Sequence, residues 1–223
     1  MFLLLLRNFL MEKIKTVIFG GSFDPVHTGH LSLASEVVAS GLADEVWFMV
    51  SPQNPHKEAC RLSDENLRLQ MVQLAIEGKD KLIASDFEFN LPRPSYTIDT
   101  LSALESRYPE REFILLIGAD NWEKFDRWYK HEEILSRYKI IVYPRDNSRK
   151  PELPSGVTWL SARLHDVSST QIRELVAKGG SISGLVSPAV EMFINRNKLY
   201  TGICARDDSG ILGDKLFAIP KKP

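Results

Sequence analysis

Two histidines in a glycine-rich segment are the residues of this chain best suited to do chemistry. His27 and His30 end the stretch GGSFDPVHTGH at residues 20–30, here called the histidine segment, which follows an apolar stretch and leads into a helical pattern. Backbone N–H groups at a turn and a helix start bind anions, and side chains three positions apart on a helix can face one phosphate. The histidine segment therefore predicts a site that holds a nucleotide phosphate and assists chemistry on it.

Motif comparison narrows the kind of nucleotide site. The histidine segment lacks the Gly-Lys-Ser/Thr of a P-loop and the G-x-G-x-x-G of a dinucleotide fingerprint. A single histidine here would more often cap or solvate a helix end, with Asp24-Pro25 shaping a turn. The pairing of two histidines after a strand favours the phosphate site. No cysteine or clear third ligand is nearby in sequence, so we predict no protein-bound metal.

A second segment near the carboxyl end carries groups that suit a triphosphate. The stretch VSSTQIR at residues 167–173, here called the arginine segment, places three hydroxyl residues before a helix and Arg173 in its first turn. Hydroxyls, free helix amides and a guanidinium all donate to phosphate oxygens. An ordinary helix N-cap with a solvated arginine is the alternative for this segment taken alone.

The pattern of elements predicts an α/β protein. Helical patterns follow His27 as far as Gly41, cover residues 63–78, begin again near Thr97 and end at Pro109, and surround 128–138. After residue 160 the chain is again predicted to be helical, to about Asn197. Apolar stretches between them predict strands at 15–20, 45–50, 81–89, 113–117, 139–143 and 157–160. Apolar strands alternating with helices predict a Rossmann-like, doubly wound parallel sheet with helices on both faces and a small helical C-terminal part. Ligands of such folds bind at the carboxyl ends of the strands.

Composition limits the possible partners. A chain of 223 residues with 43% hydrophobic residues can form one domain, and its net charge of −1 predicts neither nucleic-acid nor membrane binding. Small phosphorylated substrates fit this charge better than polymers. Cys60 and Cys204 lie far apart, so no disulfide framework is expected and a cytoplasmic location is predicted.

We expect three parts along the chain. Residues 1–13 form a leader that is expected to be disordered and lacks the features of a signal peptide, with Met11 as the natural start. Residues 14–200 form the nucleotide-binding domain, and residues 201–223 form a tail of unknown order.

Taken together, these segments resemble the HxGH nucleotidyltransferases and, more closely, the bacterial nicotinate-nucleotide adenylyltransferases. The histidine and arginine segments mark the superfamily, and the resemblance runs from about residue 15 to residue 200. Four further stretches belong to it, of which the last three indicate the pyridine-nucleotide branch: PHK at 55–57, PSYTIDTL at 94–101, GAD at 118–120 and WY at 128–129. The stretch 90–93 is less basic and glycine-rich than this family leads us to expect.

The resemblance implies a reaction and its cofactor. ATP and nicotinate mononucleotide would give deamido-NAD and pyrophosphate, as a phosphate oxygen of the mononucleotide attacks the α-phosphorus of ATP. No protein nucleophile is needed, because such transfer depends on positioning and charge stabilisation. Mg²⁺ is expected to accompany ATP. The implied partners are these two substrates, and a homo-oligomer is left open.

The resemblance also implies roles for individual residues. The catalytic residues are His27, His30 and Arg173, with His30 at the α-phosphate and Arg173 at the departing pyrophosphate. The residues expected to bind ATP are Gly20, Gly21, Ser22, Phe23, Gly118, Asp120, Ser168, Ser169 and Thr170, with Asp120 at the ribose. The residues expected to bind the second substrate are Lys57, Tyr96, Thr97, Trp128 and Tyr129, with Lys57 at a phosphate and Trp128 stacked on the pyridine ring.

Other functions stay open at this stage. A nicotinamide-mononucleotide or phosphopantetheine adenylyltransferase would share the superfamily motifs, although the latter should lack the Ser-Tyr-Thr and Trp-Tyr stretches. A non-catalytic nucleotide sensor on the same fold would be expected to have lost His30 or Arg173, and both are present. A dehydrogenase is opposed by the missing G-x-G-x-x-G.

Overall fold

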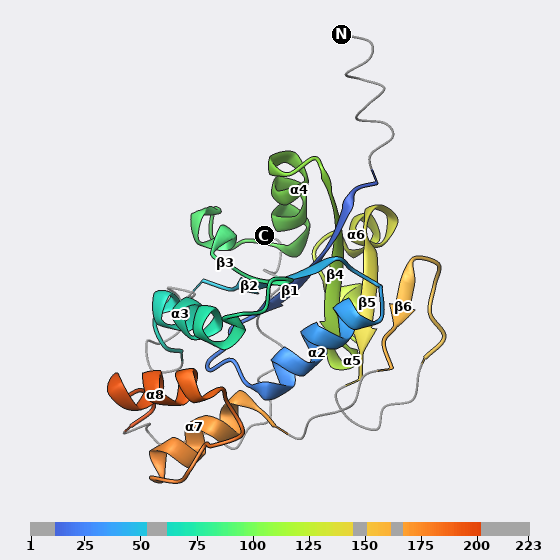
Figure 1. Ribbon diagram of the computed structural model, residues 1–223. Coiled ribbons are helices and arrows are strands. Elements are labelled where there is room, and N and C mark those ends of the chain that lie inside the picture. Colours follow the sequence, from blue (N-terminus) through green and yellow to red (C-terminus); the bar gives the residue numbers. More distant parts are fainter. Residues whose placement is uncertain (1–11, 53–61, 145–150, 162–166, 202–223) are drawn as a thin grey trace.

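A parallel β-sheet forms the centre of the molecule. The computed structural model describes residues 12–52, 62–144, 151–161 and 167–201. In this part of the chain six strands pair in the order β3-β2-β1-β4-β5-β6, and every pairing is parallel (Figure 1). The strands are β1 (Ile14–Gly21), β2 (Glu45–Val50), β3 (Leu82–Ser85), β4 (Arg111–Gly118), β5 (Lys139–Tyr143) and β6 (Val157–Trp159).

Most side chains of the strands are apolar because both faces of the sheet are covered. In β1, Val17 and Phe19 belong to one buried cluster, whereas Ile18 between them belongs to the other. Alternate side chains of a strand point to opposite faces, and burial of both sets explains the uninterrupted apolar stretches. The predicted doubly wound parallel sheet is confirmed.

Helices form a layer on each face of the sheet (Figure 1). One buried cluster contains residues of the helices α2 (Thr28–Ala39), α3 (Glu65–Ile76), α7 (Ser169–Ala177) and α8 (Pro188–Arg196). The other contains residues of α4 (Thr97–Arg107), α5 (Ala119–Trp122), α6 (His131–Arg137) and the 3₁₀ helix η2 (Phe125–Arg127).

The order of the strands locates the ligand crevice. Chain progression runs outward from β1 to β3 on one side and from β4 to β6 on the other, so the direction of winding reverses between β1 and β4. Open α/β sheets bind their ligands at such a point, beyond the carboxyl ends of the strands. The histidine segment follows β1 and the Gly-Ala-Asp stretch ends β4, so both lie at this place.

Two elements differ from the sequence prediction. The extended stretch expected at 81–89 is a strand only to Ser85, because the Ser85 hydroxyl accepts from the Phe87 N–H at 3.3 Å and the chain turns into the 3₁₀ helix η1 (Phe87–Asn90). The helix expected around 128–138 begins at His131. Lys130 precedes it in the left-handed region, with φ 52°, and this turn separates α6 from η2.

A charged residue occupies the core side of α3. On this helix, Met71 and Ala75 are buried, whereas Leu67 and Leu74 are half-buried. Arg68 has no exposed side-chain area at all. Patterns of apolar residues cannot reveal such a position, because they treat every arginine as a surface residue.

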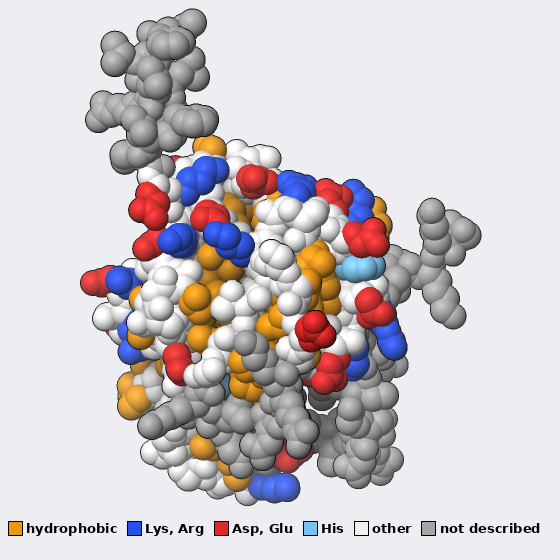
Figure 2. Space-filling view, turned by 90° about the vertical axis from the view of Figure 1, so that its right-hand side faces the viewer, with side chains coloured by type: hydrophobic (Ala, Val, Ile, Leu, Met, Phe, Trp, Pro, Cys, Tyr) orange, Lys and Arg blue, Asp and Glu red, His pale blue; other side chains and the backbone are white. Residues whose placement is uncertain are grey.

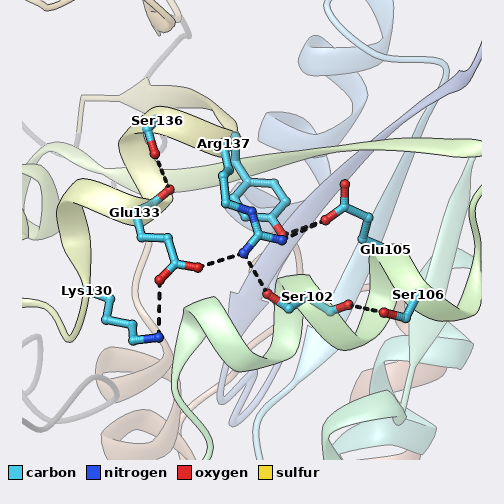
Figure 3. Close-up of polar contacts among 8 residues, drawn as sticks. Ser102, Glu105, Ser106, Lys130, Glu133, Ser136 and Arg137 are labelled. Carbon is cyan, nitrogen blue, oxygen red and sulfur yellow. Dashed lines mark hydrogen bonds and ion pairs between the residues drawn. The ribbon is translucent and has the colours of Figure 1, made fainter.

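One face of the molecule is mixed in charge. The face in Figure 2 shows Lys and Arg side chains among Asp and Glu side chains, with apolar side chains exposed between them. On the second face of the sheet, Arg137 of α6 forms ion pairs with Glu105 of α4 at 2.8 Å and with Glu133 at 2.7 Å (Figure 3). Among the described residues, no helix is long and apolar enough to cross a membrane.

Candidate active site

The two histidines are held against each other at the start of α2. The rings of His27 and His30 stack with centroids 3.6 Å apart and planes inclined by 24°. The backbone N–H of His27 donates to Nδ1 of His30 at 3.2 Å. An Nδ1 that accepts a hydrogen bond carries no proton, so the N–H donor of the neutral His30 ring is at Nε2. Such a donor suits a phosphate oxygen.

The glycines of the histidine segment serve different purposes. A Cβ atom at Gly21 would lie 2.9 Å from the Phe23 ring, and one at Gly29 would lie 3.1 Å from Nδ1 of His27. Both glycines therefore allow close packing within the segment. A Cβ atom at Gly20 would meet nothing within 4 Å, so this glycine borders open space where a ligand can approach the backbone.

The structure brings the histidine and arginine segments together. Nη1 of Arg173 donates to the backbone carbonyl of Asp24 at 2.7 Å, and the Ser169 hydroxyl donates to the carbonyl of Pro25 at 2.9 Å. These partners lie 149 and 144 residues apart in the chain. A single site can therefore use groups of both segments.

Within the arginine segment, the hydroxyls already have structural partners. Nη2 of Arg173 donates to the Thr170 hydroxyl at 3.1 Å, and the Ser168 hydroxyl caps α7 by accepting from the Gln171 N–H at 3.2 Å. The N-cap alternative thus describes what Ser168 does in this structure. The roles of Ser168, Ser169 and Thr170 toward ATP stay predictions.

A cleft opens between the carboxyl ends of β1 and β4. Its walls include Gly20, Thr97 and Gly118, each of which was predicted from the sequence to bind a substrate. The Thr97 hydroxyl oxygen is buried and has no hydrogen-bond partner among the described residues. Buried polar atoms are nearly always paired, so this hydroxyl is suited to meet a polar group of a ligand.

Sequence reasoning missed other residues of the cleft. Glu88, Thr100, Asn121 and Tyr143 also line it. The Thr100 hydroxyl donates to Oε1 of Glu88 at 2.9 Å. Burial raises the pKa of Glu88, and the hydrogen bond from Thr100 acts in the opposite direction. Asn121 directly follows the Gly-Ala-Asp stretch and Thr100 lies within PSYTIDTL, so both could have been found there. Glu88 gave no signal, because its stretch was interpreted as a strand.

The predicted aromatic pair is divided between core and surface. Trp128 is 7% exposed and packs on Phe125 with ring centroids 5.3 Å apart. Tyr129 is 46% exposed and lies against Tyr96, with centroids 4.6 Å apart. Trp128 therefore already contributes to the core. Its stacking on a pyridine ring stays a prediction.

The remaining predicted residues are placed as follows. Asp120 is half-buried in the first turn of α5, directly after the strand-ending Gly118. Ser22 is half-buried, whereas Phe23 is 2% exposed and packs on His30 with ring centroids 5.1 Å apart. Lys57 lies outside the described residues, so its predicted contact with a phosphate is not located.

The fold and this site define a class of protein. A family model described as cytidylyltransferase-like matches residues 18–175, which include the whole of the histidine segment and the arginine segment. The chain belongs to this class of nucleotidyltransferase.

Similar proteins define the family more narrowly. A protein of Bacteroides fragilis named probable nicotinate-nucleotide adenylyltransferase is 53% identical over 81% of this chain and 90% of its own length. A Bacteroides thetaiotaomicron protein of the same name is 46% identical over 82% and 92%. The chain therefore belongs to the nicotinate-nucleotide adenylyltransferase family.

A solved structure supports the fold. The nicotinic acid mononucleotide adenylyltransferase of Plasmodium falciparum, solved in complex with NaAD, superposes with a TM-score of 0.69. It is 20% identical and matches 84% of this chain and 97% of its own length. At that identity the likeness shows the shared fold.

Proposed function

We propose that this chain transfers the adenylyl group of ATP to nicotinate mononucleotide, giving deamido-NAD and pyrophosphate. A phosphate oxygen of the mononucleotide forms a bond to the α-phosphorus, and the bond from that phosphorus to the oxygen bridging to the β-phosphate breaks. The leaving pyrophosphate takes both electrons of that bond. No covalent enzyme intermediate is required.

The observation that carries this proposal is the contact of the histidine and arginine segments beside a cleft at the strand ends. The neutral His30 ring carries its N–H at Nε2. Nη1 of Arg173 lies 2.7 Å from the Asp24 carbonyl oxygen, which belongs to the same segment as His30. Charge developing on the phosphate oxygens during transfer is stabilised by donors that are already in place. We assign His30 to the α-phosphate, and Arg173 to the departing pyrophosphate. The similarity to proteins named nicotinate-nucleotide adenylyltransferase supports the choice of second substrate.

Mg²⁺ is proposed to accompany ATP and neutralise part of its charge. Among the described residues, no three side chains of His, Cys, Asp or Glu are grouped so as to hold a metal ion. Mg²⁺ usually takes most of its ligands from substrate phosphates and water, and we propose the same arrangement here. The protein side chains then bind and orient the phosphates.

Pyrophosphate release tests the proposal. The purified protein is given ATP and Mg²⁺ with nicotinate mononucleotide, nicotinamide mononucleotide or phosphopantetheine in separate reactions. We expect the fastest turnover with nicotinate mononucleotide. Equal turnover with both mononucleotides would refute the acid preference, fastest turnover with phosphopantetheine would refute the substrate class, and none with any acceptor would indicate a nucleotide-binding protein without activity.

The cytoplasmic location and the oligomeric state stay predictions. Separating the cell fractions and measuring the mass of the protein in solution would decide them.

A further inference from the structure

A buried carboxylate lies inside the histidine segment. Asp24 is 1% exposed, and its carboxylate accepts from the Tyr200 hydroxyl at 2.7 Å and from the Ser63 N–H at 3.2 Å. Tyr200 follows α8 and lies 176 residues further along the chain. Burial of an ionised carboxylate is unfavourable unless donors compensate it. The hydrogen bond from the Tyr200 hydroxyl therefore helps to stabilise the buried carboxylate of Asp24.

A buried arginine holds the neighbouring residue of the same segment. Arg68 donates from Nη1 to the carbonyl of Ser22 at 2.7 Å and from Nε to the carbonyl of Ser63 at 2.9 Å. Burial lowers the pKa of Arg68, and the charge of Asp24 opposes this shift. Ser63 bridges the two charged groups, because its N–H contacts Asp24 and its carbonyl contacts Arg68.

The backbone conformation indicates that these contacts are needed. Phe23, between the two held residues, has φ 49° although it is not a glycine, and Tyr200 itself has φ 63°. A left-handed backbone is unfavourable for a residue other than glycine and persists only where surrounding contacts determine it. Asp24, Ser22 and Tyr200 provide such contacts on both sides of Phe23.

Arg173 and Tyr200 hold the same residue in different ways. Arg173 contacts the backbone carbonyl of Asp24, whereas Tyr200 contacts its carboxylate. If Arg173 turns to a triphosphate, its Nη1 contact with Asp24 is weakened at the moment when the histidines must be in place. Tyr200 and Arg68 make their contacts to Asp24 and Ser22 within the protein.

We propose that Tyr200, together with Arg68, is a positioning residue for adenylyl transfer that holds residues 22–25 so that His27 and His30 keep their geometry when Arg173 binds the triphosphate. This inference rests on the proposed function. Burial, followed by the charge of Asp24, raises the pKa of Tyr200, so its hydroxyl stays protonated and donates across the working pH range.

The variant Tyr200→Phe tests the inference because it removes one hydroxyl and keeps the ring. We expect kcat to fall roughly 10-fold while KM for ATP changes less than about 2-fold, since one hydrogen bond to a charged acceptor is lost away from the substrate. The matched control is Tyr138→Phe, which removes a tyrosine hydroxyl 3.1 Å from the Glu105 carboxylate on the other face of the sheet. The control should keep the wild-type kcat.

Histidine NMR spectra provide a second measurement that does not need turnover. We expect the imidazole signals of His27 and His30 to shift in Tyr200→Phe and to stay in place in Tyr138→Phe. Unchanged imidazole signals with kcat within about 2-fold of wild type would overturn the inference, as would equal losses of kcat in both variants that follow their losses of melting temperature. If the wild type fails to use any acceptor, the proposed function is wrong and the imidazole signals alone decide the inference.

Discussion

Two arginines, one on each face of the sheet, differ in how deeply they are buried and in the partners of their hydrogen bonds. Beside the histidine segment, Arg68 is fully buried and its hydrogen bonds go to two backbone carbonyls. On the α4–α6 face, Arg137 contacts Glu105, Glu133 and Ser102, yet its side chain remains 38% exposed (Figure 3). Arg137 makes more side-chain contacts, but water can replace each of them.

Burial, rather than the number of contacts, determines how much a polar group contributes to stability. A buried donor that loses its partners leaves unpaired groups, at a cost of about 1–3 kcal/mol each. An exposed ion pair is screened by water and salt and contributes little. The buried guanidinium of Arg68 also lies beside the histidine segment, where adenylyl transfer is expected. Its removal should therefore affect both stability and activity.

The largest effect is expected from Arg68→Met. The change removes two donors, which leaves the carbonyls of Ser22 and Ser63 without them, and it removes a positive charge that interacts with the buried Asp24 carboxylate. We expect the free energy of unfolding to fall by about 3 kcal/mol or more, measured by urea denaturation. Arg137→Met is the matched control. Similar losses in the two variants would contradict the comparison.

A large effect on activity, with less on stability, is expected from His30→Ala. Loss of one preorganised donor to the transition state should lower kcat roughly 10²-fold in the pyrophosphate assay. His131→Ala is the control, because this imidazole also packs on a phenylalanine, Phe125, with centroids 6.1 Å apart, but on the other face of the sheet. If His30→Ala kept near-wild-type turnover, His30 would only shape the turn.

The sequence predicted the parts of this site that are local in the chain. Strand β1, the glycine-rich turn and helix α2 follow one another directly, so their residue types predict a phosphate site before any contact is known. The sequence did not indicate that Arg68 and Tyr200 contact the histidine segment, for two physical reasons. An arginine in an amphipathic helix is indistinguishable by pattern from a surface arginine, and the partner of Tyr200 lies 176 residues away.

The aromatic pair marks another limit of sequence reasoning. Trp128 and Tyr129 are adjacent and similar in type, yet one is 7% exposed and the other 46%. Trp128 packs on the buried Phe125, whereas Tyr129 lies against Tyr96. No local preference of either aromatic residue foretells that difference.

A smaller effect that depends on pH is expected from Glu88→Gln. The amide keeps an oxygen for the Thr100 hydroxyl and removes the ionisable carboxyl. Burial raises the pKa of Glu88, so folding favours its protonated form. The resulting stabilisation is complete below the ordinary value of 4.5 and is lost as pH rises through the raised pKa.

We therefore expect Glu88→Gln to melt about 2–4 °C above the wild type near pH 8 and to show no advantage near pH 4. Thermal unfolding across this range measures the difference. Glu123→Gln, at an exposed position, is the control and should follow the wild type at every pH. An advantage of Glu88→Gln that is constant with pH would show that removal of the charge is not its cause.

The smallest effect is expected from Arg137→Met, and it tests the exposed side of the comparison. Exposed ion pairs typically contribute little even when several share one arginine, because long side chains lose conformational freedom when they pair. We expect a melting temperature within about 2 °C of the wild type, an unchanged kcat, and a difference that disappears near 1 M salt, where the screening length falls to about 3 Å. A loss that persists at high salt would have to come from packing of the arginine stem, since Arg137 also lies over the Tyr138 ring at 5.1 Å. In that case Arg137 would stabilise the fold through apolar contact of its stem, and its ion pairs would contribute nothing.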